Sequence, residues 1–213
     1  MSNVSNADND PSQHKGLLND GIFYCDHIRE TDTDIIAGFE QKHSENGNGL
    51  ANYLKNTALK HEKMGWMRTY LVKDVESDEL VGYFSIKAGM VSVEEREIIV
   101  DTDTGETEMT FDALPGIELA NLGVNNAYQR NHEEMRGIGV LIFRHFVLPI
   151  VNDIPKTLGV ALLYIFALPF DELIDRYSRV YGFRRLDSKS EDDLHKRVKP
   201  FYDLRCIFMY QLL

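Results

Sequence analysis

Five consecutive residues, Arg136-Gly137-Ile138-Gly139-Val140, carry the clearest chemical signal in the sequence. The two glycines remove side chains where an apolar, helix-like run begins, so successive backbone N–H groups can point at one anion. The positive end of the helix dipole adds to the attraction, and phosphate is the usual ligand of such a turn. Two glycines also occur in turns that bind nothing, and that alternative stays open on these residues alone.

The residues around the glycines exclude two other phosphate-binding motifs. A P-loop would need Lys and then Ser or Thr after its last glycine, whereas Val140 and Leu141 follow Gly139. A Rossmann fingerprint would need a third glycine at Ile142 and would normally follow the first strand of a repeating unit.

The elements on either side must position this loop. An apolar strand is predicted at 117–124, then a polar loop at 125–136, a helix at 139–151, a strand at 160–167, and a helix at 171–181 that ends at Gly182. Earlier in the chain the pattern predicts a strand at 22–28, helices at 33–39 and 50–63, and strands at 68–72 and 80–86. An excursive hairpin is predicted at 93–111, with its bend at 101–105. Short strands at 184–186 and 206–212 complete the order.

Composition limits the class of protein. The 213 residues are 43% hydrophobic, which suits one globular domain at 21–213, preceded by a flexible, polar tail at 1–20. The net charge of -11 opposes nonspecific attraction to nucleic acid or anionic lipid and favours a cationic or amine substrate.

The remaining features predict location and chemistry. The apolar runs are too short to span a membrane, and the N-terminus lacks the pattern of a signal peptide, so a cytoplasmic location is expected. Cys25 and Cys206 lie in apolar stretches and are expected to be buried thiols. The histidines have no metal-ligand spacing, so no metal is expected.

The order of strand, glycine loop, helix, strand, helix and Gly182-Phe183 resembles the GNAT superfamily of acyl-coenzyme A-dependent N-acyltransferases. Their motif A has a Gln/Arg-x-x-Gly-x-Gly/Ala loop, and their motif B helix ends in Gly-Phe. Two departures stand out: Glu134 occupies the Gln/Arg position, and the loop at 128–135 is longer than usual. The resemblance implies an α/β (α+β), three-layer fold with a mixed, mostly antiparallel sheet flanked by helices, splayed between 118–124 and 162–167.

The resemblance also implies roles for particular residues, with acetyl-CoA as co-substrate. Glu118 would be the general base, Asn121 would orient a catalytic water, and Tyr177 would protonate the departing thiolate, with Ser178 as a substitute. Tyr177 stands five residues before Gly182, although the family usually places this tyrosine four before the glycine. The cofactor-binding set comprises Leu122, Gly123, Val124, Arg136, Gly137, Ile138, Gly139 and Val140.

The function implied is an N-acetyltransferase that moves an acetyl (acyl) group from acetyl-CoA directly to a primary amine. The acceptor would be a small molecule or peptide, shaped by 50–65 and 93–114, with nucleic acid an unlikely partner, no membrane contact and a homodimer left open. Two alternatives remain: a non-catalytic acyl-CoA-binding module, and a toxin that acetylates aminoacyl-tRNA.

Overall fold

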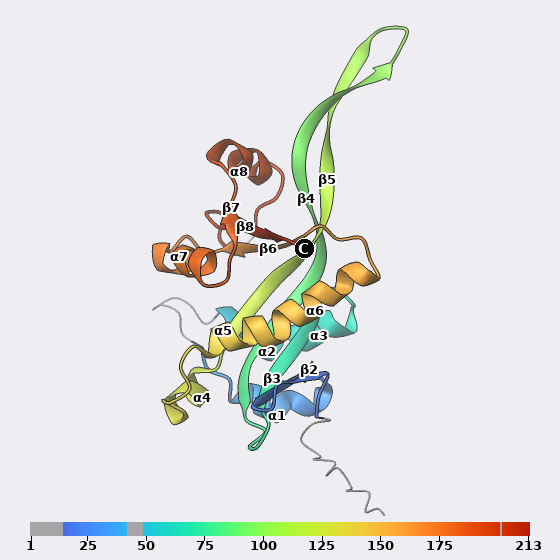
Figure 1. The fold of residues 1–213 in the computed structure, drawn as a ribbon. Helices are drawn as coiled ribbons and strands as arrows, with labels where there is room; N and C mark the ends of the chain where they lie inside the picture. The colour runs from blue at the N-terminus through green and yellow to red at the C-terminus, as the bar shows by residue number, and fades with distance from the viewer. Residues whose placement is uncertain (1–14, 42–48, 201) are drawn as a thin grey trace, which may run out of the picture. The chain divides into compact units, whose positions relative to one another are not determined.

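The computed structural model describes residues 15–41, 49–200 and 202–213, which pack as two compact units. Unit 1 comprises the described residues of Met1–Ser85 together with Asn121–Phe146, and unit 2 comprises Ile86–Ala120 with Val147–Leu213. Two long strands, β4 (Leu80–Asp101) and β5 (Glu106–Val124), run through both units (Figure 1). Residues 1–14 of the predicted tail lie outside the described residues.

Unit 1 is a sheet in the order β1-β2-β3-β4-β5 with helices packed on it. β1 (Leu18–Asn19), β2 (Phe23–His27) and β3 (Arg68–Asp74) join successively as antiparallel neighbours. The sequence assigned Leu18 and Asn19 to the tail, but they pair with Cys25 and Tyr24. A core forms beneath the helices, with Phe39, Leu54, Ala58, Leu71 and Tyr83 almost inaccessible to solvent. The helices are η2 (Glu30–Asp32), α1 (Thr33–Ala37), α2 (Gly49–Asn56), α3 (Ala58–Lys63), α4 (Asn126–Asn131) and α5 (Ile138–Ile142).

Unit 2 continues the two long strands in the order β4-β5-β6-β8-β7. β6 (Leu162–Ala167) is parallel to β5 and antiparallel to β8 (Ile207–Leu212), which pairs with β7 (Arg184–Arg185). Tyr164, Leu194 and Phe208 lie at the centre of its core. The helices of unit 2 are α6 (Leu148–Asp153), η4 (Ile154–Lys156), α7 (Asp171–Arg179) and α8 (Ser188–His195). The mixed, mostly antiparallel sheet with flanking helices confirms the predicted fold class.

The parallel ladder between β5 and β6 is short. It joins Gly116–Glu118 to Leu162–Tyr164 and ends there, although both strands continue. Gly116 helps the strands approach, because a Cβ there would lie 3.0 Å from Cδ1 of Leu162. Pairing therefore stops at Glu118, where the sequence placed the start of the splay.

The hairpin of β4 and β5 is more continuous than the sequence indicated. The sequence predicted separate strands at 80–86 and 117–124 and a hairpin at 93–111 between them, yet each strand is unbroken from its core end to the turn at 102–105. Asp101 shapes this turn: its carboxylate accepts hydrogen bonds from the amides of Asp103 and Thr104 at 2.8 and 3.3 Å, and Gly105 has a φ of 71°. The excursion is thus an extension of the two sheet strands, and the bend lies where it was predicted.

The helices show three further differences. The predicted helix at 139–151 contains a π-helical turn, η3 (Phe143–Val147), between α5 and α6. The predicted helix at 50–63 divides at Thr57 into α2 and α3. α4 and α8 were not predicted, although Asp187 caps α8 by accepting from the amides of Lys189 and Ser190.

The stretch Ile138–Lys156 is long and apolar enough to cross a membrane, judged by length and composition alone. A helix in a protein core can meet the same criterion, and 33% of the window in this stretch is buried, including Ile138 and Ile142. Cys25 and Cys206 are free, buried thiols, as predicted.

Candidate functional site

The glycine loop (Arg136–Val140) opens α5 in unit 1. Gly137 is the N-cap residue and adopts the left-handed conformation, with φ 73° and ψ 20°. Its carbonyl accepts the first helical hydrogen bonds, from the amides of Val140 at 2.8 Å and Leu141 at 3.2 Å. The amides of Ile138 and Gly139 precede these bonds, so they are the donors that a helix N-terminus offers to an anion. Val140 was predicted to present its amide as well, but that amide is engaged within the helix.

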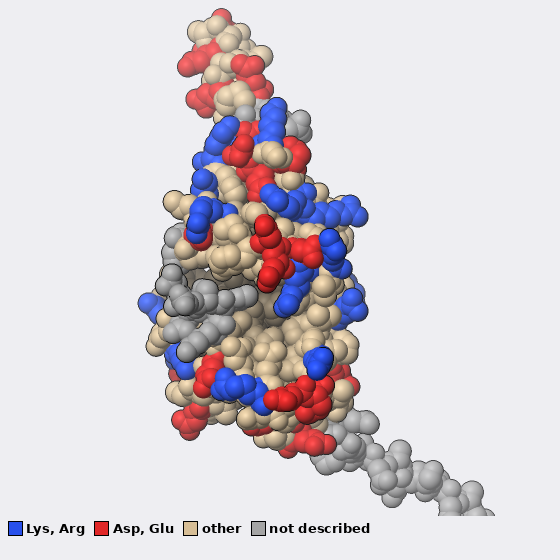
Figure 2. Space-filling model, turned by 90° about the vertical axis from the view of Figure 1, so that its left-hand side faces the viewer, with Lys and Arg blue, Asp and Glu red and all other residues tan. Residues whose placement is uncertain are grey.

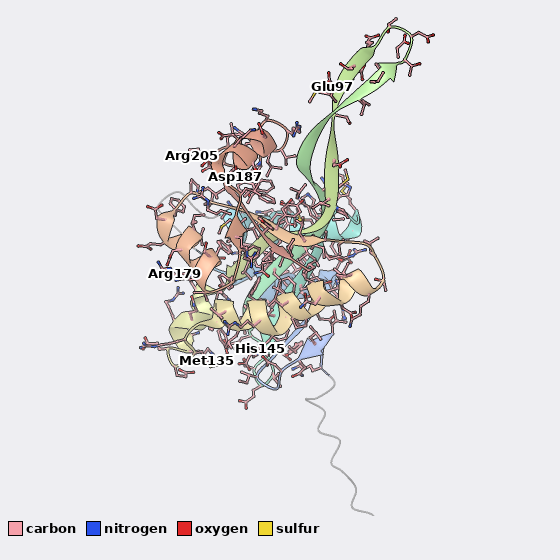
Figure 3. All side chains as sticks on the ribbon, turned by 45° about the horizontal axis from the view of Figure 1, so that its top comes forward. Glu97, Met135, His145, Arg179, Asp187 and Arg205 are labelled. Carbon is pink, nitrogen blue, oxygen red and sulfur yellow. The ribbon has the colours of Figure 1, made fainter. Side chains whose placement is uncertain are left out.

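The side chains of the loop differ in burial. Ile138 is buried and fixes the start of α5, whereas Arg136 and Gly137 are exposed. Nothing lies within 4 Å of where a Cβ on Gly137 would be, so glycine is required there by its backbone conformation and not by crowding. Figure 3 labels Met135, just before the loop, and His145, on the π-helical turn. His145 Nδ1 lies 2.6 Å from Asp20 Oδ2 and ties this helix to the turn between β1 and β2.

The C-terminal end of β5 carries Leu122, Gly123 and Val124. Gly123 is buried, and a Cβ there would lie 2.5 Å from Gln41 Oε1 and 3.0 Å from Cε1 of Tyr83. Leu122 and Val124 are half-buried, as is Asn121. A side chain at the middle of this tripeptide would require Gln41 and Tyr83 to shift.

Asn125, which the sequence did not single out, holds the end of β5 in place. Its buried side chain accepts hydrogen bonds from the amides of Glu40 and Ala127 at 3.0 and 3.1 Å and donates to the carbonyl of Leu80 at 2.8 Å. It also caps α4. A polar residue between an apolar strand and a helix was a possible N-cap signal, but its contact with Glu40 has no local signature.

The stretch predicted as a polar loop is braced at its centre. The Tyr128 hydroxyl donates to Asp74 at 2.7 Å, and its ring stacks on His132 with 4.1 Å between centroids. His132 Nε2 lies 3.1 Å from Glu79, whose hydrogen bond raises the pKa of the imidazole above its usual value against the opposing effect of burial. These contacts fix the chain that enters the glycine loop.

Glu118 lies in unit 2 as a buried carboxylate with two partners. Lys87 Nζ is 3.2 Å from its Oε2, and the Tyr164 hydroxyl hydrogen-bonds to it. Burial raises the pKa of Tyr164, and the negative charge of Glu118 raises it further, so the phenol stays protonated and acts as donor. Gly89 leaves room for this hydroxyl, because a Cβ there would lie 1.9 Å from Tyr164 Oη.

Burial of a carboxylate is costly unless the charge is paired and hydrogen-bonded. The partners of Glu118 therefore compensate its buried charge, which argues against the interpretation of Glu118 as a solvated residue at a strand edge. Neither Lys87 nor Tyr164 was singled out by the sequence, since each lies on a different strand from Glu118 and far from it in the chain.

Tyr177 lies near the end of α7 in unit 2 and is half-buried, whereas Ser178 is exposed. The Tyr177 ring packs against Tyr181 and Phe183, with centroids 5.5 and 5.8 Å apart. Burial raises the pKa of its hydroxyl, and Tyr181 raises it further against the opposing effect of Arg176. The phenol is thus protonated near neutral pH, the form that a general acid requires.

The last turn beyond α7 is wider than an ordinary helix end. The amide of Tyr181 bonds to the carbonyl of Arg176 at 3.3 Å, and that of Phe183 bonds to Tyr177 at 2.9 Å. These bonds span five and six residues, one more than the bonds that usually close a helix before a left-handed glycine. Gly182 has a φ of 80°, as its predicted C-cap role requires. The extra residue between Tyr177 and Gly182 is therefore absorbed in this turn.

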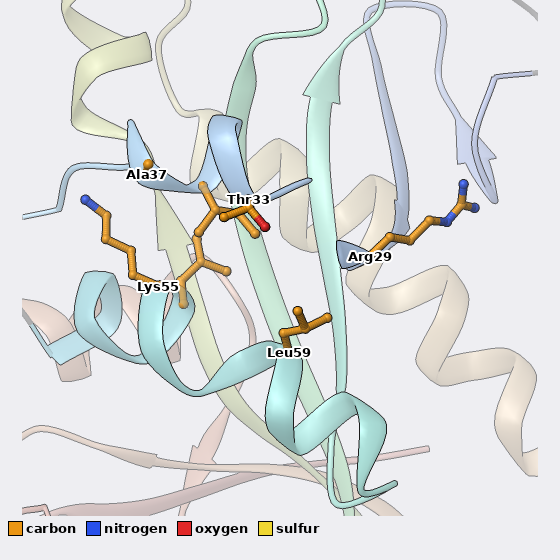
Figure 4. A pocket seen from close by; sticks show the side chains of 7 residues that line it. Arg29, Thr33, Ala37, Lys55 and Leu59 are labelled. Carbon is orange, nitrogen blue, oxygen red and sulfur yellow. The ribbon is translucent and has the colours of Figure 1, made fainter. Parts of the chain in front are cut away.

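A separate pocket of about 220 Å³ occurs in unit 1 (Figure 4). Its floor is apolar, and Figure 4 shows the long side chains of Arg29 and Lys55 extending away from one another. Polar groups do not converge in it, so we assign it no chemistry. Its lining consists of Arg29, Thr33, Ile36, Ala37, Leu54, Lys55 and Leu59.

Comparison with solved structures identifies the fold as that of the GNAT superfamily. KacT, as a tyrosine-to-phenylalanine mutant, matches with a TM-score of 0.61 and 16% identity over 90% of this chain and 95% of that chain. A tyrosine-to-phenylalanine mutant of the AtaT toxin, bound to the C-terminus of the antitoxin AtaR and acetyl-CoA, has a TM-score of 0.59 and 13% identity over 89% of this chain and 92% of that chain. AtaT complexed with acetyl-methionyl-tRNAfMet has a TM-score of 0.60 and 12% identity over 89% and 94%. No protein-family model matches the sequence, and no curated protein does.

At these identities the likeness establishes the fold, and the expected GNAT order of elements is confirmed. The expectation that nucleic acid is an unlikely partner is not borne out, since one of these similar proteins is complexed with a transfer RNA. The net charge argues only against nonspecific attraction to polyanions. It does not exclude a specific nucleic-acid partner.

Proposed function

We propose that this chain is an acetyl-CoA-dependent N-acetyltransferase that transfers the acetyl group directly to a primary amine. One observation carries the proposal: a left-handed Gly137 opens α5 after β5 in a fold shared with AtaT, which has been solved with acetyl-CoA bound. Acetyl-CoA carries phosphates of the kind that the free amides of a helix N-terminus bind. The fold alone would be compatible with many functions, whereas this loop has a ligand chemistry.

The cofactor would be held mainly by backbone. The amides of Ile138 and Gly139 would donate to the pyrophosphate, and Arg136 would add a nearby positive charge. The backbone of Leu122, Gly123 and Val124 would bind the pantetheine arm, with Val124 as the oxyanion donor.

Glu118 would accept the amine proton, directly or through a water that Asn121 orients. Lys87 and Tyr164 would then position the carboxylate toward the amine. This role is consistent with a carboxylate held by two partners at the end of the β5–β6 ladder.

Tyr177 would return a proton to the departing thiolate of coenzyme A. Its protonated hydroxyl suits this step, and the widened turn before Gly182 accounts for its unusual spacing. Ser178 is the weaker candidate because its hydroxyl is a far poorer acid than a phenol.

The acceptor has two candidates. A small-molecule or peptide amine suits the acidic chain, whereas the AtaT complex with acetyl-methionyl-tRNAfMet favours the α-amino group of an aminoacyl-tRNA. The net charge of -11 does not rank the aminoacyl-tRNA below the smaller amines, because it opposes only nonspecific attraction to polyanions. Either reaction fits a single domain in the cytoplasm, where acetyl-CoA and charged transfer RNA are both available.

The test combines binding with turnover. Calorimetry with acetyl-CoA should give one site on the wild type, and thiol release should follow with at least one amine in a panel of polyamines, amino acids, peptides and Met-tRNA. Glu118→Gln should retain acetyl-CoA binding and lower kcat by about 10²- to 10⁴-fold, the usual contribution of a general base. Glu172→Gln, at an exposed position on α7, is the matched control.

Three outcomes separate the possibilities. Absence of acetyl-CoA binding would overturn the proposal. Binding without turnover on any acceptor would favour the non-catalytic module. Turnover on Met-tRNA alone would identify the second acceptor.

A further inference from the structure

The far end of the β4–β5 hairpin, residues 97–110, is here named the arm. Its turn is well specified, as the hydrogen bonds of Asp101 and the φ of Gly105 show, and Thr107 Oγ1 donates to Glu97 Oε1 across the strands at 2.6 Å. An isolated two-stranded hairpin is only marginally stable in water, however, and usually needs a third strand or a packed face. The arm therefore has a well-defined turn but lacks the third strand or packed face that would stabilise it.

The neighbouring strands do not reach the arm. β6 pairs with β5 only at Gly116–Glu118, and β3 spans only Arg68–Asp74 beside the start of β4. Within the part of the chain that the structure describes, both outer edges of the arm thus offer unpaired backbone groups to another strand.

Apolar side chains on the arm are open to solvent. Ile99 and Met109 are each 65% exposed, and Ile98 and Val100 are 44% and 46% exposed. Since side chains alternate along a strand, Ile98 and Val100 point to one face of β4 and Ile99 to the other. Neither face is therefore the simple polar exterior of a solvated ribbon, and each leaves apolar side chains that a partner would cover.

The charges of the arm select the partner. The segment has five acidic residues and no Lys or Arg, with Glu97, Asp101, Asp103, Glu106 and Glu108 all on it. Figure 2 shows only acidic and uncharged residues at the end of this projection. A second copy of the arm would bring like charges together, whereas a cationic strand would neutralise them.

We propose that the arm docks a basic segment of another protein, which adds as a strand to one open edge and covers Ile99 with its own apolar residues. Main-chain hydrogen bonds would supply affinity and the alternating cationic side chains would supply selectivity. This interaction does not depend on the proposed acetyl transfer.

The experiment uses the full chain and a synthetic peptide of alternating Lys and Val as probe, with a Glu-Val peptide for comparison. Fluorescence anisotropy should show binding of the Lys-Val peptide only. Glu106→Lys/Glu108→Lys should weaken binding by at least about tenfold, as opposite charges in an interface are replaced by like ones. Glu76→Lys/Glu172→Lys makes the same change in net charge at exposed sites outside the arm and should bind as the wild type does.

Two further measurements make the location specific. Ile99→Ser should also weaken binding, and amide hydrogen exchange at 97–110 should slow when the peptide binds. Equal binding by both double variants, equal binding of the two peptides, or a dimer through the arm in light scattering would overturn the proposal. Circular dichroism confirms that each variant is folded.

Discussion

Replacing Gly137 by Ala tests whether the backbone of the glycine loop, and not merely its small size, matters. A Cβ at this position would meet no atom within 4 Å, so the substitution creates no clash in the unliganded protein. The φ of 73° remains unfavourable for alanine, and a left-handed L-residue costs about 1–2 kcal/mol. For a chain of this length that cost lowers Tm by roughly 2–8 °C.

The same substitution should weaken acetyl-CoA binding, because relief of the strain would turn the amides of Ile138 and Gly139 away from the phosphates. Loss of one hydrogen bond to a charged group costs about 1.5–3 kcal/mol, which raises Kd by roughly 10- to 150-fold. Thermal unfolding and calorimetry measure the two effects separately.

Gly137→Asn provides the control for this reasoning, since asparagine tolerates the left-handed region better than alanine does. It should lose less Tm than Gly137→Ala and retain more affinity. The reasoning is refuted if Gly137→Ala matches the wild type in both Tm and Kd. If Gly137→Ala and Gly137→Asn lose affinity equally at unchanged Tm, the requirement for glycine reflects space for the ligand and not the backbone conformation.

Two other expectations follow from contacts near the site. Gly89→Ala should destabilise the protein by about 1–3 kcal/mol in urea unfolding, because its Cβ would displace the Tyr164 hydroxyl. The double variant Gly89→Ala/Tyr164→Phe should lose less stability than the sum of the two single variants. Strict additivity of the two losses would contradict this contact. Glu79 raises the pKa of His132 in the folded state, so the stabilisation by this pair is fully present below about pH 6.5 and lost as pH rises through the raised value. The Tm difference between wild type and His132→Asn should therefore shrink with increasing pH across that range, and a difference that grows would exclude the pair as its source.

The order of elements could be predicted because each has a local signature. The mostly apolar segments at 117–124 and 160–167 mark β5 and β6, and the glycines at 65 and 182 end helices with φ of 69° and 80°. The continuity of β4 could not be predicted, because a glycine such as Gly89 is locally unfavourable in the interior of a strand. Its actual role is to leave space for Tyr164, a residue on a different strand.

The site shows the same division between local and distant information. Gly137 was predictable because its conformation is a property of the turn itself. Lys87 and Tyr164 were not, because a Lys on a strand and a Tyr in an apolar run have ordinary explanations, and only the folded chain brings them to Glu118. Buried ion pairs depend on tertiary packing, which leaves no pattern in neighbouring residues.

The spacing of Tyr177 shows how a local departure can be reconciled with the family pattern. One added residue on a regular helix rotates every preceding side chain by about 100° relative to the glycine that ends it. That rotation would argue against Tyr177 as the acid. The bonds from Tyr181 to Arg176 and from Phe183 to Tyr177 place the added residue in the widened turn, beyond the regular part of α7. The helix that carries Tyr177 therefore needs no rotation, and the tyrosine remains a better candidate than Ser178, which is exposed on the next position of the helix.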